Sequence, residues 1–279
     1  MALHTVQTPL GPRGYALSDS ARPARPAPSL IMGFHGGSGD AQRFALRSGL
    51  AETFGAHGHD VAFPQALQHW ADGRAAIEES WPSDRALIDA LVRLQGGTTP
   101  AQLPVAAVGG SNGGMFSLRL ACEMTNPPLR AAVAVAAAMP VAYASRAPKG
   151  PPVPLMLVQA TEDRMIPWQG GEVPQVPGIS VPGALLGADA TVAFWLDRNR
   201  CTGQPSVRQA AIGAIPVEIF AWTADPGGAD LWRVVLRGAG HRLLDRSPDA
   251  ERKGSLEELI ARFVIWHLDR DRLSRTEPV

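Results

Sequence analysis

The sequence predicts an α/β fold, in which a mostly parallel, open sheet carries helices on both faces. Apolar runs of strand length alternate along the chain with segments of helical periodicity. Two runs, 131–136 and 153–159, are almost continuously apolar, as in strands that a parallel sheet buries on both faces. The run 105–108 leads into the tight, glycine-rich turn 109–113, after which a helical pattern begins. Because no repeat or linker interrupts this order, we expect one domain over 1–279 without a discrete lid domain.

In the N-terminal half, strands are expected at 29–34, 60–64 and 105–108. Residues 1–28 should form N-terminal strands and a loop with a proline-rich end. After the strand at 29–34, Asp40 closes a glycine-rich loop and is placed to cap a helix that continues through roughly 50–56. The next helix is expected at 84–94. Its apolar residues share one face and are Ala86, Leu87, Ala90, Leu91 and Leu94.

The C-terminal half continues the alternation of strands and helices. Besides the two runs named above, a strand is expected at 231–236. The helices are expected at 111–123, 188–200 and 256–268. The longest stretch without periodicity is 164–187, which is rich in proline and glycine. Loops of that length inside a compact domain tend to be functional, so we place this segment over the active site.

The composition is that of a globular protein with a sizeable core. The chain has 279 residues, of which 45% are hydrophobic and 19% charged. Basic and acidic residues number 26 each, and no basic stripe appears, so nucleic acid is not an expected partner. No apolar run is long enough to span a bilayer, and the first residues lack the pattern of an export signal. We therefore expect a cytoplasmic protein without a membrane partner.

The turn at 109–113 matches G-x-S-x-G with Ser111 at its centre. A strand before such a turn and a helix after it are the context of a nucleophile elbow, which projects a serine hydroxyl from the sheet edge. The motif alone is weak, because glycine and serine also occur in tight turns for structural reasons. Ser111 is nevertheless the candidate nucleophile.

Acidic and basic partners follow Ser111 in the order that a serine hydrolase of this fold requires. Asp163 comes after the strand at 153–159, and His241 comes after the strand at 231–236. A neutral imidazole must take the serine proton, and a carboxylate must orient the imidazole, so these residue types are needed together. Other residues compete for these roles: the acids are Glu162, Asp189 and Asp225, and the histidines are His4, His57, His59 and His69 in expected surface segments and His267 on a helix.

An oxyanion hole requires two backbone N–H donors. One should come from Asn112, directly after the nucleophile, and the other from Gly37 in the glycine-rich loop 35–40. His35 would organise that loop and border the substrate. The loop lacks the Gly-Lys-Ser/Thr ending of a phosphate-binding loop, and no strand is followed by G-x-G-x-x-G, so no nucleotide cofactor is expected.

The sequence does not predict a metal site or a disulfide. His57, His59 and Asp60 lie close together, but no third and fourth ligand stands nearby. Cys122 and Cys201 lack C-x-x-C spacing, and we expect two buried thiols rather than a bridge.

Six segments together resemble the polyhydroxybutyrate depolymerase and feruloyl-esterase-like family of α/β-hydrolases. The segments are 32–37, 109–115, 131–136, 160–171, 194–201 and 238–241, within a resemblance that runs from about 30 to 268. The resemblance implies an α/β-hydrolase fold with Ser111 as nucleophile, Asp163 as acid and His241 as base. It also implies Gly37 and Asn112 as the oxyanion donors.

The chain departs from that family in two respects. Members often carry Thr-Trp-Pro-Gly after the histidine, where this chain has 242–245, Arg-Leu-Leu-Asp. Secreted members that degrade polymers have an export signal and often an adsorption domain, neither of which is expected here. The expected function is therefore a serine carboxylesterase that hydrolyses soluble esters, such as hydroxyalkanoate oligomers and short-chain acyl or aryl esters. Acyl transfer or amide hydrolysis on the same triad, and a catalytically silent binding module, are the alternatives.

Two tryptophans are candidates to line the substrate pocket, because an indole offers a large apolar face with one polar group. They are Trp168, in the segment 164–187, and Trp70. For Trp70, packing in the core is an equally good interpretation.

Overall fold

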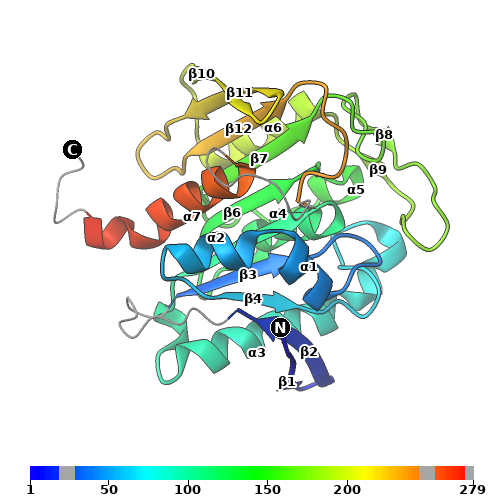
Figure 1. Ribbon diagram of the computed structural model, residues 1–279, viewed down its shortest axis with the longest axis vertical. Coiled ribbons are helices and arrows are strands. Elements are labelled where there is room, and N and C mark those ends of the chain that lie inside the picture. The colour runs from blue at the N-terminus through cyan, green and yellow to red at the C-terminus, as the bar shows by residue number, and fades with distance from the viewer. Residues whose placement is uncertain (19–28, 245–254, 274–279) are drawn as a thin grey trace.

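One sheet of ten strands runs through the molecule in the order β1-β2-β4-β3-β5-β6-β7-β12-β11-β10 (Figure 1). This computed structural model describes residues 1–18, 29–244 and 255–273. The strands of the sheet are β1 (Leu3–Thr8), β2 (Gly11–Leu17), β3 (Leu30–Phe34), β4 (Val61–Pro64), β5 (Val105–Gly110), β6 (Leu129–Val135), β7 (Leu155–Ala160), β10 (Ser206–Ile212), β11 (Ile215–Trp222) and β12 (Leu231–Leu236).

The six central strands, from β4 to β12 in the order of the sheet, are parallel to one another. These six are the strands that the apolar runs predict. Antiparallel strands extend the sheet at both edges, β1 and β2 at one and β11 and β10 at the other. The mostly parallel α/β fold is therefore confirmed, and β10 and β11 are additions that the sequence patterns did not reveal. Six of the seven residues of β10 are exposed, so this edge strand lacks the apolar run that marks a buried strand.

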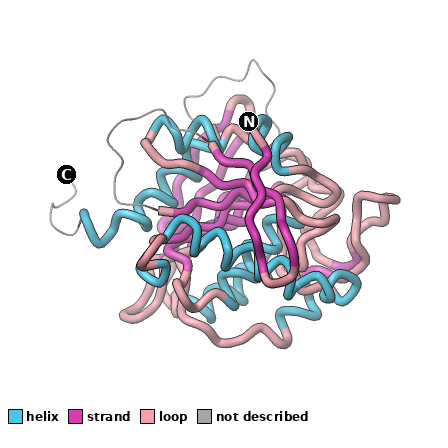
Figure 2. The backbone as a smooth tube through the Cα atoms, turned by 90° about the horizontal axis from the view of Figure 1, so that it is seen from below, coloured by secondary structure: helices cyan, strands magenta, loops and turns pink. Residues whose placement is uncertain are grey.

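Helices cover both faces of the sheet. On the face nearer the viewer in Figure 1 lie α1 (Ala41–Arg47), α2 (Leu50–Ala56) and α7 (Leu256–Leu273). On the other face lie α3 (Trp81–Gly96), α4 (Asn112–Glu123) and α6 (Ala188–Asn199). The short helices are α5 (Val141–Ala144), η1 (Ala75–Ser80) and η2 (Pro100–Gln102). Figure 2 shows the strands in the middle of the molecule, surrounded by helices and loops.

Side chains alternate between two apolar layers along the central strands. Met32, Ala107 and Leu155 pack toward α3, α4 and α6. The preceding or following residues, such as Ile31 and Ala106, pack toward α1, α2 and α7. Because both layers are apolar, the central strands are buried on both faces, which explains their continuous apolar runs.

The helix predicted after Asp40 is two helices. Asp40 caps α1 as expected, since its Oδ1 accepts a hydrogen bond of 2.7 Å from the backbone N–H of Arg43. The chain then breaks at Gly49, which has a φ of +71°, and α2 begins at the next residue. A left-handed residue cannot continue an α-helix, so the expectation of one helix through 56 was wrong.

The segment 164–187 is mostly irregular and includes a small hairpin of β8 (Gly171–Glu172) and β9 (Ala184–Leu185).

Cys122 and Cys201 are both buried and free, as expected. Across the described ranges, none of the helices combines the length and the apolar character needed to cross a membrane.

Candidate active site

Ser111 occupies the turn between β5 and α4. Its φ of +55° and ψ of −124° lie in a region that residues with a side chain rarely adopt. The Ser111 N–H donates to the carbonyl of Val135 on the neighbouring strand at 2.8 Å, which holds the turn against the sheet edge. This conformation is the strained strand-to-helix turn of a nucleophile elbow.

The flanking glycines are required because backbone segments approach closely on both sides of Ser111. A Cβ at Gly109 would lie 2.1 Å from the carbonyl oxygen of Gly113. A Cβ at Gly113 would lie 2.3 Å from the carbonyl oxygen of Phe34, at the end of β3. The glycines of the motif therefore let α4 start directly against β3 and β5.

Asp163, His241 and Ser111 form a continuous chain of hydrogen bonds. The distance between His241 Nε2 and Ser111 Oγ is 3.0 Å, and that between His241 Nδ1 and Asp163 Oδ2 is 2.8 Å. Because an ionised carboxylate only accepts hydrogen bonds, Nδ1 carries the proton and donates it to Asp163. The lone pair of Nε2 is then free to accept the proton of the Ser111 hydroxyl.

The Asp163 carboxylate is fixed on both oxygens. Its Oδ1 accepts hydrogen bonds from the backbone N–H groups of Met165 and Ile166, at 2.8 and 2.9 Å. The side chain is only 2% exposed. These contacts orient Oδ2 toward His241, so the acid is held in place by the first residues of the segment 164–187.

The competing acids and histidines lie in other environments. Glu162 is exposed, Asp189 pairs with Arg233, and Asp225 accepts a hydrogen bond from Thr202. Among the histidines, His4 packs against Tyr15, His57 pairs with Glu258, His59 lies within hydrogen-bond distance of Ser29, and His267 packs against Phe263. The structure thus brings together Ser111, Asp163 and His241, and none of these competitors.

His35 supports the glycine-rich loop rather than facing the solvent. Its Nδ1 lies 2.8 Å from the carbonyl oxygen of Gly36, and its Nε2 accepts a hydrogen bond of 3.2 Å from the N–H of Ala66. These partners require a neutral ring with the proton on Nδ1. Burial lowers the pKa of His35, in agreement with the neutral form.

Gly37 and Asn112, the two expected oxyanion donors, line one cavity with Ser111. Gly36 and His241 line the same cavity. A Cβ at Gly37 would lie 2.6 Å from the carbonyl oxygen of Ile179, so the loop is in contact with the segment 164–187 at this point. The N–H groups of the first turn of α4, which begins at Asn112, have no acceptor within the helix and can serve an anion.

The side chain of Asn112 is fully engaged in a buried polar network. Its Oδ1 accepts from the N–H of Trp70 at 2.8 Å, and its Nδ2 donates to the carbonyl of Trp70 at 2.9 Å and to Asp72 Oδ2 at 2.7 Å. Asp72 pairs with Arg74, whose Nη1 donates to the carbonyl oxygen of Val181. The network therefore connects the turn at Ser111 to the segment 164–187.

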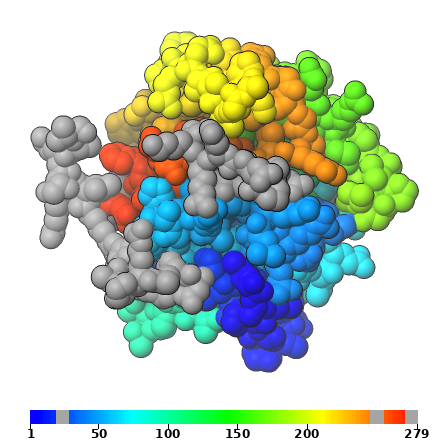
Figure 3. Space-filling view, in the orientation of Figure 1, coloured from blue at the N-terminus to red at the C-terminus, as the bar shows by residue number. Residues whose placement is uncertain are grey.

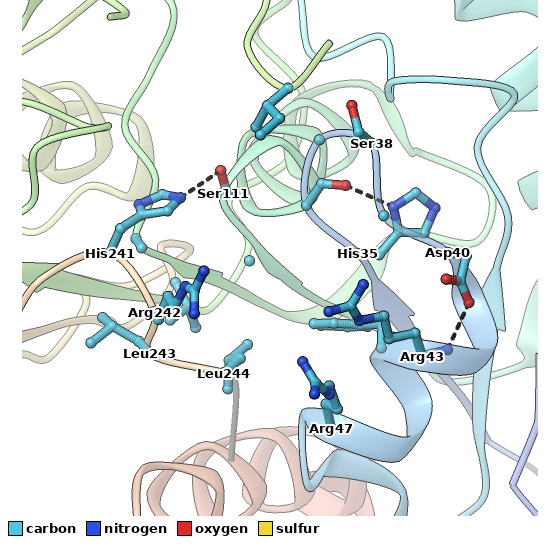
Figure 4. Close-up of a pocket in the computed structure, with 18 residues that line it drawn as sticks. His35, Ser38, Asp40, Arg43, Arg47, Ser111, His241, Arg242, Leu243 and Leu244 are labelled. Atoms are coloured by element: carbon cyan, nitrogen blue, oxygen red, sulfur yellow. Dashed lines mark hydrogen bonds between the residues drawn. The ribbon is translucent and has the colours of Figure 1, made fainter. Parts of the chain in front are cut away.

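Two cavities meet at Ser111 and His241. One has a volume of about 400 Å³ and lies between α1 and the residues that follow His241 (Figure 4). We call it the α1 cavity. The other has a volume of about 340 Å³ and lies under the segment 164–187, and we call it the loop cavity. Volumes in this range suit small-molecule ligands.

The two tryptophans that were expected to line the substrate pocket lie outside both cavities. Trp70 is fully buried, stacks on Phe116 and donates its indole N–H to the carbonyl of His35, so it packs in the core. Trp168 lies behind Asp163, where Arg233 sits over its ring at 5.1 Å. Neither tryptophan lines the α1 cavity or the loop cavity.

Four residues without a sequence motif line the cavities. His69 and Arg74 line the loop cavity, Arg43 lines the α1 cavity, and Arg242 lines both. His69 lies in a surface segment, as expected, but is itself half-buried, and its Nδ1 has no hydrogen-bond partner among the described residues. Burial and, to a smaller extent, the charge of Arg74 lower the pKa of His69. Only the position of Arg242 beside His241 is a signal that the sequence could have provided.

Comparison with known proteins places this chain among esterases. No family model matches the chain. This chain is 33% identical over 260 residues to the curated protein "Putative esterase NocK" of Nocardia uniformis subsp. tsuyamanensis. The match covers 82% of this chain and 70% of that protein.

Solved structures share the fold at low sequence identity. Est1E from Butyrivibrio proteoclasticus is 13% identical, with both chains covered completely and a TM-score of 0.51. Esterase PE8 is 15% identical, with 94% of this chain and 98% of that chain covered and a TM-score of 0.52. At these identities the likeness concerns the fold, which is that of the α/β-hydrolases.

Proposed function

Because this chain belongs to the esterase family of the α/β-hydrolases, we propose that it is a serine carboxylesterase with Ser111, His241 and Asp163 as its catalytic triad. The observation that carries this proposal is the unbroken chain of hydrogen bonds from Asp163 through His241 to Ser111. A serine hydroxyl is a weak nucleophile at neutral pH, and a base at 3.0 Å that a buried carboxylate orients is what activates it.

The reaction proceeds in two steps. Ser111 Oγ attacks the carbonyl carbon of the ester while His241 Nε2 takes the hydroxyl proton, and the N–H groups of Gly37 and Asn112 stabilise the oxyanion. His241 then returns the proton to the leaving alcohol, which leaves an acyl group on Ser111. Water, activated by His241, attacks this acyl-enzyme and releases the acid.

Soluble esters with small acyl and alcohol parts are the proposed substrates. The α1 cavity and the loop cavity each have room for a short chain or one ring, on either side of Ser111. Hydroxyalkanoate oligomers and short-chain acyl or aryl esters meet this requirement, and they agree with the resemblance to the polyhydroxybutyrate depolymerase and feruloyl-esterase-like family. His35 acts in this scheme by holding the glycine-rich loop in place. A cytoplasmic location remains a prediction from the sequence.

The proposal is tested by comparing the wild type with Ser111→Ala on p-nitrophenyl acetate and on a fluorophosphonate probe. We expect the wild type to turn over the ester and to be labelled on Ser111, and the variant to lose several orders of magnitude in rate and all labelling. Ser145→Ala, on an exposed turn, is the matched control and should retain both. Full turnover by Ser111→Ala, or a wild type that the probe leaves unlabelled, would refute the proposal.

The same experiment separates the alternatives. A silent binding module would not react with the fluorophosphonate. An acyltransferase or an amidase would be labelled, but product analysis in the presence of competing alcohols or on the matching amide would reveal transfer or amide cleavage in place of ester hydrolysis.

A further inference from the structure

The α1 cavity carries an excess of positive charge directly beside the nucleophile. Three arginines line it, Arg43 and Arg47 from α1 and Arg242 from the residue after His241 (Figure 4). Among the described lining residues, the single carboxylate is that of Asp40, whose Oδ1 accepts a hydrogen bond from the backbone N–H of Arg43. The formal charge of the whole chain is zero, so this local excess is not a general property of the surface.

Two of these guanidinium groups have no acidic partner among the residues that the structure describes. No carboxylate in 1–18, 29–244 or 255–273 forms an ion pair with the side chain of Arg43 or Arg242. Other arginines near the site differ in this respect, since Arg74 pairs with Asp72 and Arg119 with Glu78. The unpaired guanidinium groups therefore remain available to a ligand.

The residues that carry this charge come from distant parts of the chain. Figure 3 shows the surface of α1 next to the surface of the residues that follow β12, and Arg43 and Arg242 line one cavity although 199 positions separate them (242 − 43 = 199). The segment that follows Leu244, residues 245–254, has three acidic and three basic residues, so its own charges cancel.

The loop cavity on the other side of Ser111 has no unpaired arginine of its own, because it shares Arg242 with the α1 cavity. Its lining under the segment 164–187 is mainly apolar, with Met115, Val173, Val176 and Val181 among its residues. The other arginine there, Arg74, is paired with Asp72. An ester whose carbonyl lies at Ser111 would thus place an apolar part in the loop cavity and its other part near unpaired arginines.

We propose that the preferred substrates of this esterase are esters with a free carboxylate on the half that enters the α1 cavity, where Arg43 and Arg242 bind it. This inference rests on the proposed function and specifies its substrate class. Guanidinium groups suit this role because their planar N–H donors match a carboxylate geometrically. Both arginines are exposed, so water and salt weaken the attraction, and we expect a preference of about tenfold in kcat/KM at low ionic strength.

The test measures kcat/KM on pairs of esters that differ only in one charged group. One pair is para-(acetoxymethyl)benzoate and its carboxamide, with the charge on the alcohol half. The other is monoethyl adipate and its carboxamide, with the charge on the acyl half. We expect the carboxylate to be preferred about tenfold in at least one pair, and the preference to fall as salt is raised from about 0.01 to 0.5 M because the charges are exposed.

Substitutions then assign the preference to the two arginines. In Arg43→Gln and Arg242→Gln, the ratio of kcat/KM between carboxylate and carboxamide should fall by about threefold each, and Arg242→Glu should bring it to one or below. The ratio cancels any effect of a substitution on the neighbouring His241. Arg208→Gln, on the exposed edge strand β10, is the matched control and should leave the ratio at its wild-type value.

The outcomes distinguish this inference from the proposed function. If the neutral esters are hydrolysed but neither carboxylate is preferred, or if the preference survives in Arg43→Gln, Arg242→Gln and their double variant, the inference is wrong and the esterase proposal stands. If no ester of either pair is hydrolysed and the fluorophosphonate does not label Ser111, the esterase proposal itself fails.

Discussion

The side-chain amide of Asn112 donates a hydrogen bond of 2.7 Å to the carboxylate of Asp72, so the residue after Ser111 is held by a buried ion pair. Asp72 also accepts hydrogen bonds from the Arg74 guanidinium, which reaches the carbonyl oxygen of Val181 in the segment over the site. The nucleophile turn and the loop that covers it therefore share one set of polar contacts, although 70 residues separate them (181 − 111 = 70).

Asp72→Ala should destabilise the protein severely. The carboxylate is fully buried, and its removal leaves the buried Arg74 guanidinium without a counter-charge and Asn112 Nδ2 without one of its acceptors. We expect a loss of about 3–5 kcal/mol in the free energy of unfolding, measured by urea denaturation. Asp89→Ala is the matched control, because its pair with Arg85 on α3 is partly exposed, and it should cost less than about 1 kcal/mol. Equal losses in the two variants would contradict this account.

Asp163→Asn should reduce activity far more than stability. An amide at this position no longer fixes the proton on His241 Nδ1, so the imidazole loses the tautomer that accepts from Ser111. We expect kcat to fall by about 10³–10⁴-fold on p-nitrophenyl acetate. Glu162→Gln changes the adjacent, exposed acid and should keep kcat within about twofold of the wild type. A large loss in Glu162→Gln with little loss in Asp163→Asn would reverse the assignment of the acid.

Gly113→Ala and Gly55→Ala should have opposite effects on stability. The new methyl group at 113 would lie 2.3 Å from the carbonyl oxygen of Phe34, so α4 must move away from β3, and a loss of at least about 1–3 kcal/mol is expected. At 55, in α2, nothing lies within 4 Å of the added Cβ, and alanine should gain up to about 1 kcal/mol from its higher helix propensity. Thermal unfolding of both variants measures the difference, and a gain at 113 would show that the elbow tolerates a side chain.

Protonation of His35 should make the protein less stable at mildly acid pH. Burial lowers the pKa of His35 below its usual 6.5, so the unfolded chain binds the proton more readily than the folded protein. The free energy of unfolding should consequently decrease as the pH falls below about 6.5 toward the lowered pKa of the folded state. Urea denaturation at several pH values measures this slope, and His35→Gln should flatten it while His4→Gln, on the exposed strand β1, leaves it unchanged. An equal slope in the wild type and in His35→Gln would exclude His35 as its origin.

Local patterns in the sequence were sufficient for the central fold. The apolar runs of the buried strands and the glycines around Ser111 reflect constraints that act within a few residues, namely burial on two faces and close backbone approach. The same predicted strands indicated that Ser111, Asp163 and His241 meet. Each of these residues follows a parallel strand, and residues that follow parallel strands lie at the same edge of the sheet. Edge strands such as β10 escaped detection because their side chains face water.

Only the tertiary structure decided which distant residues meet at the site. Trp70 proved to pack in the core, Asp72 accepts a hydrogen bond from Asn112, and Arg74 pairs with Asp72, although no motif marks any of the three. The approach of Arg43 to Arg242 depends on how α1 packs beside the residues that follow β12. Periodicity and turn motifs depend on neighbours in the sequence, whereas such contacts depend on the packing of whole elements, which no local pattern encodes.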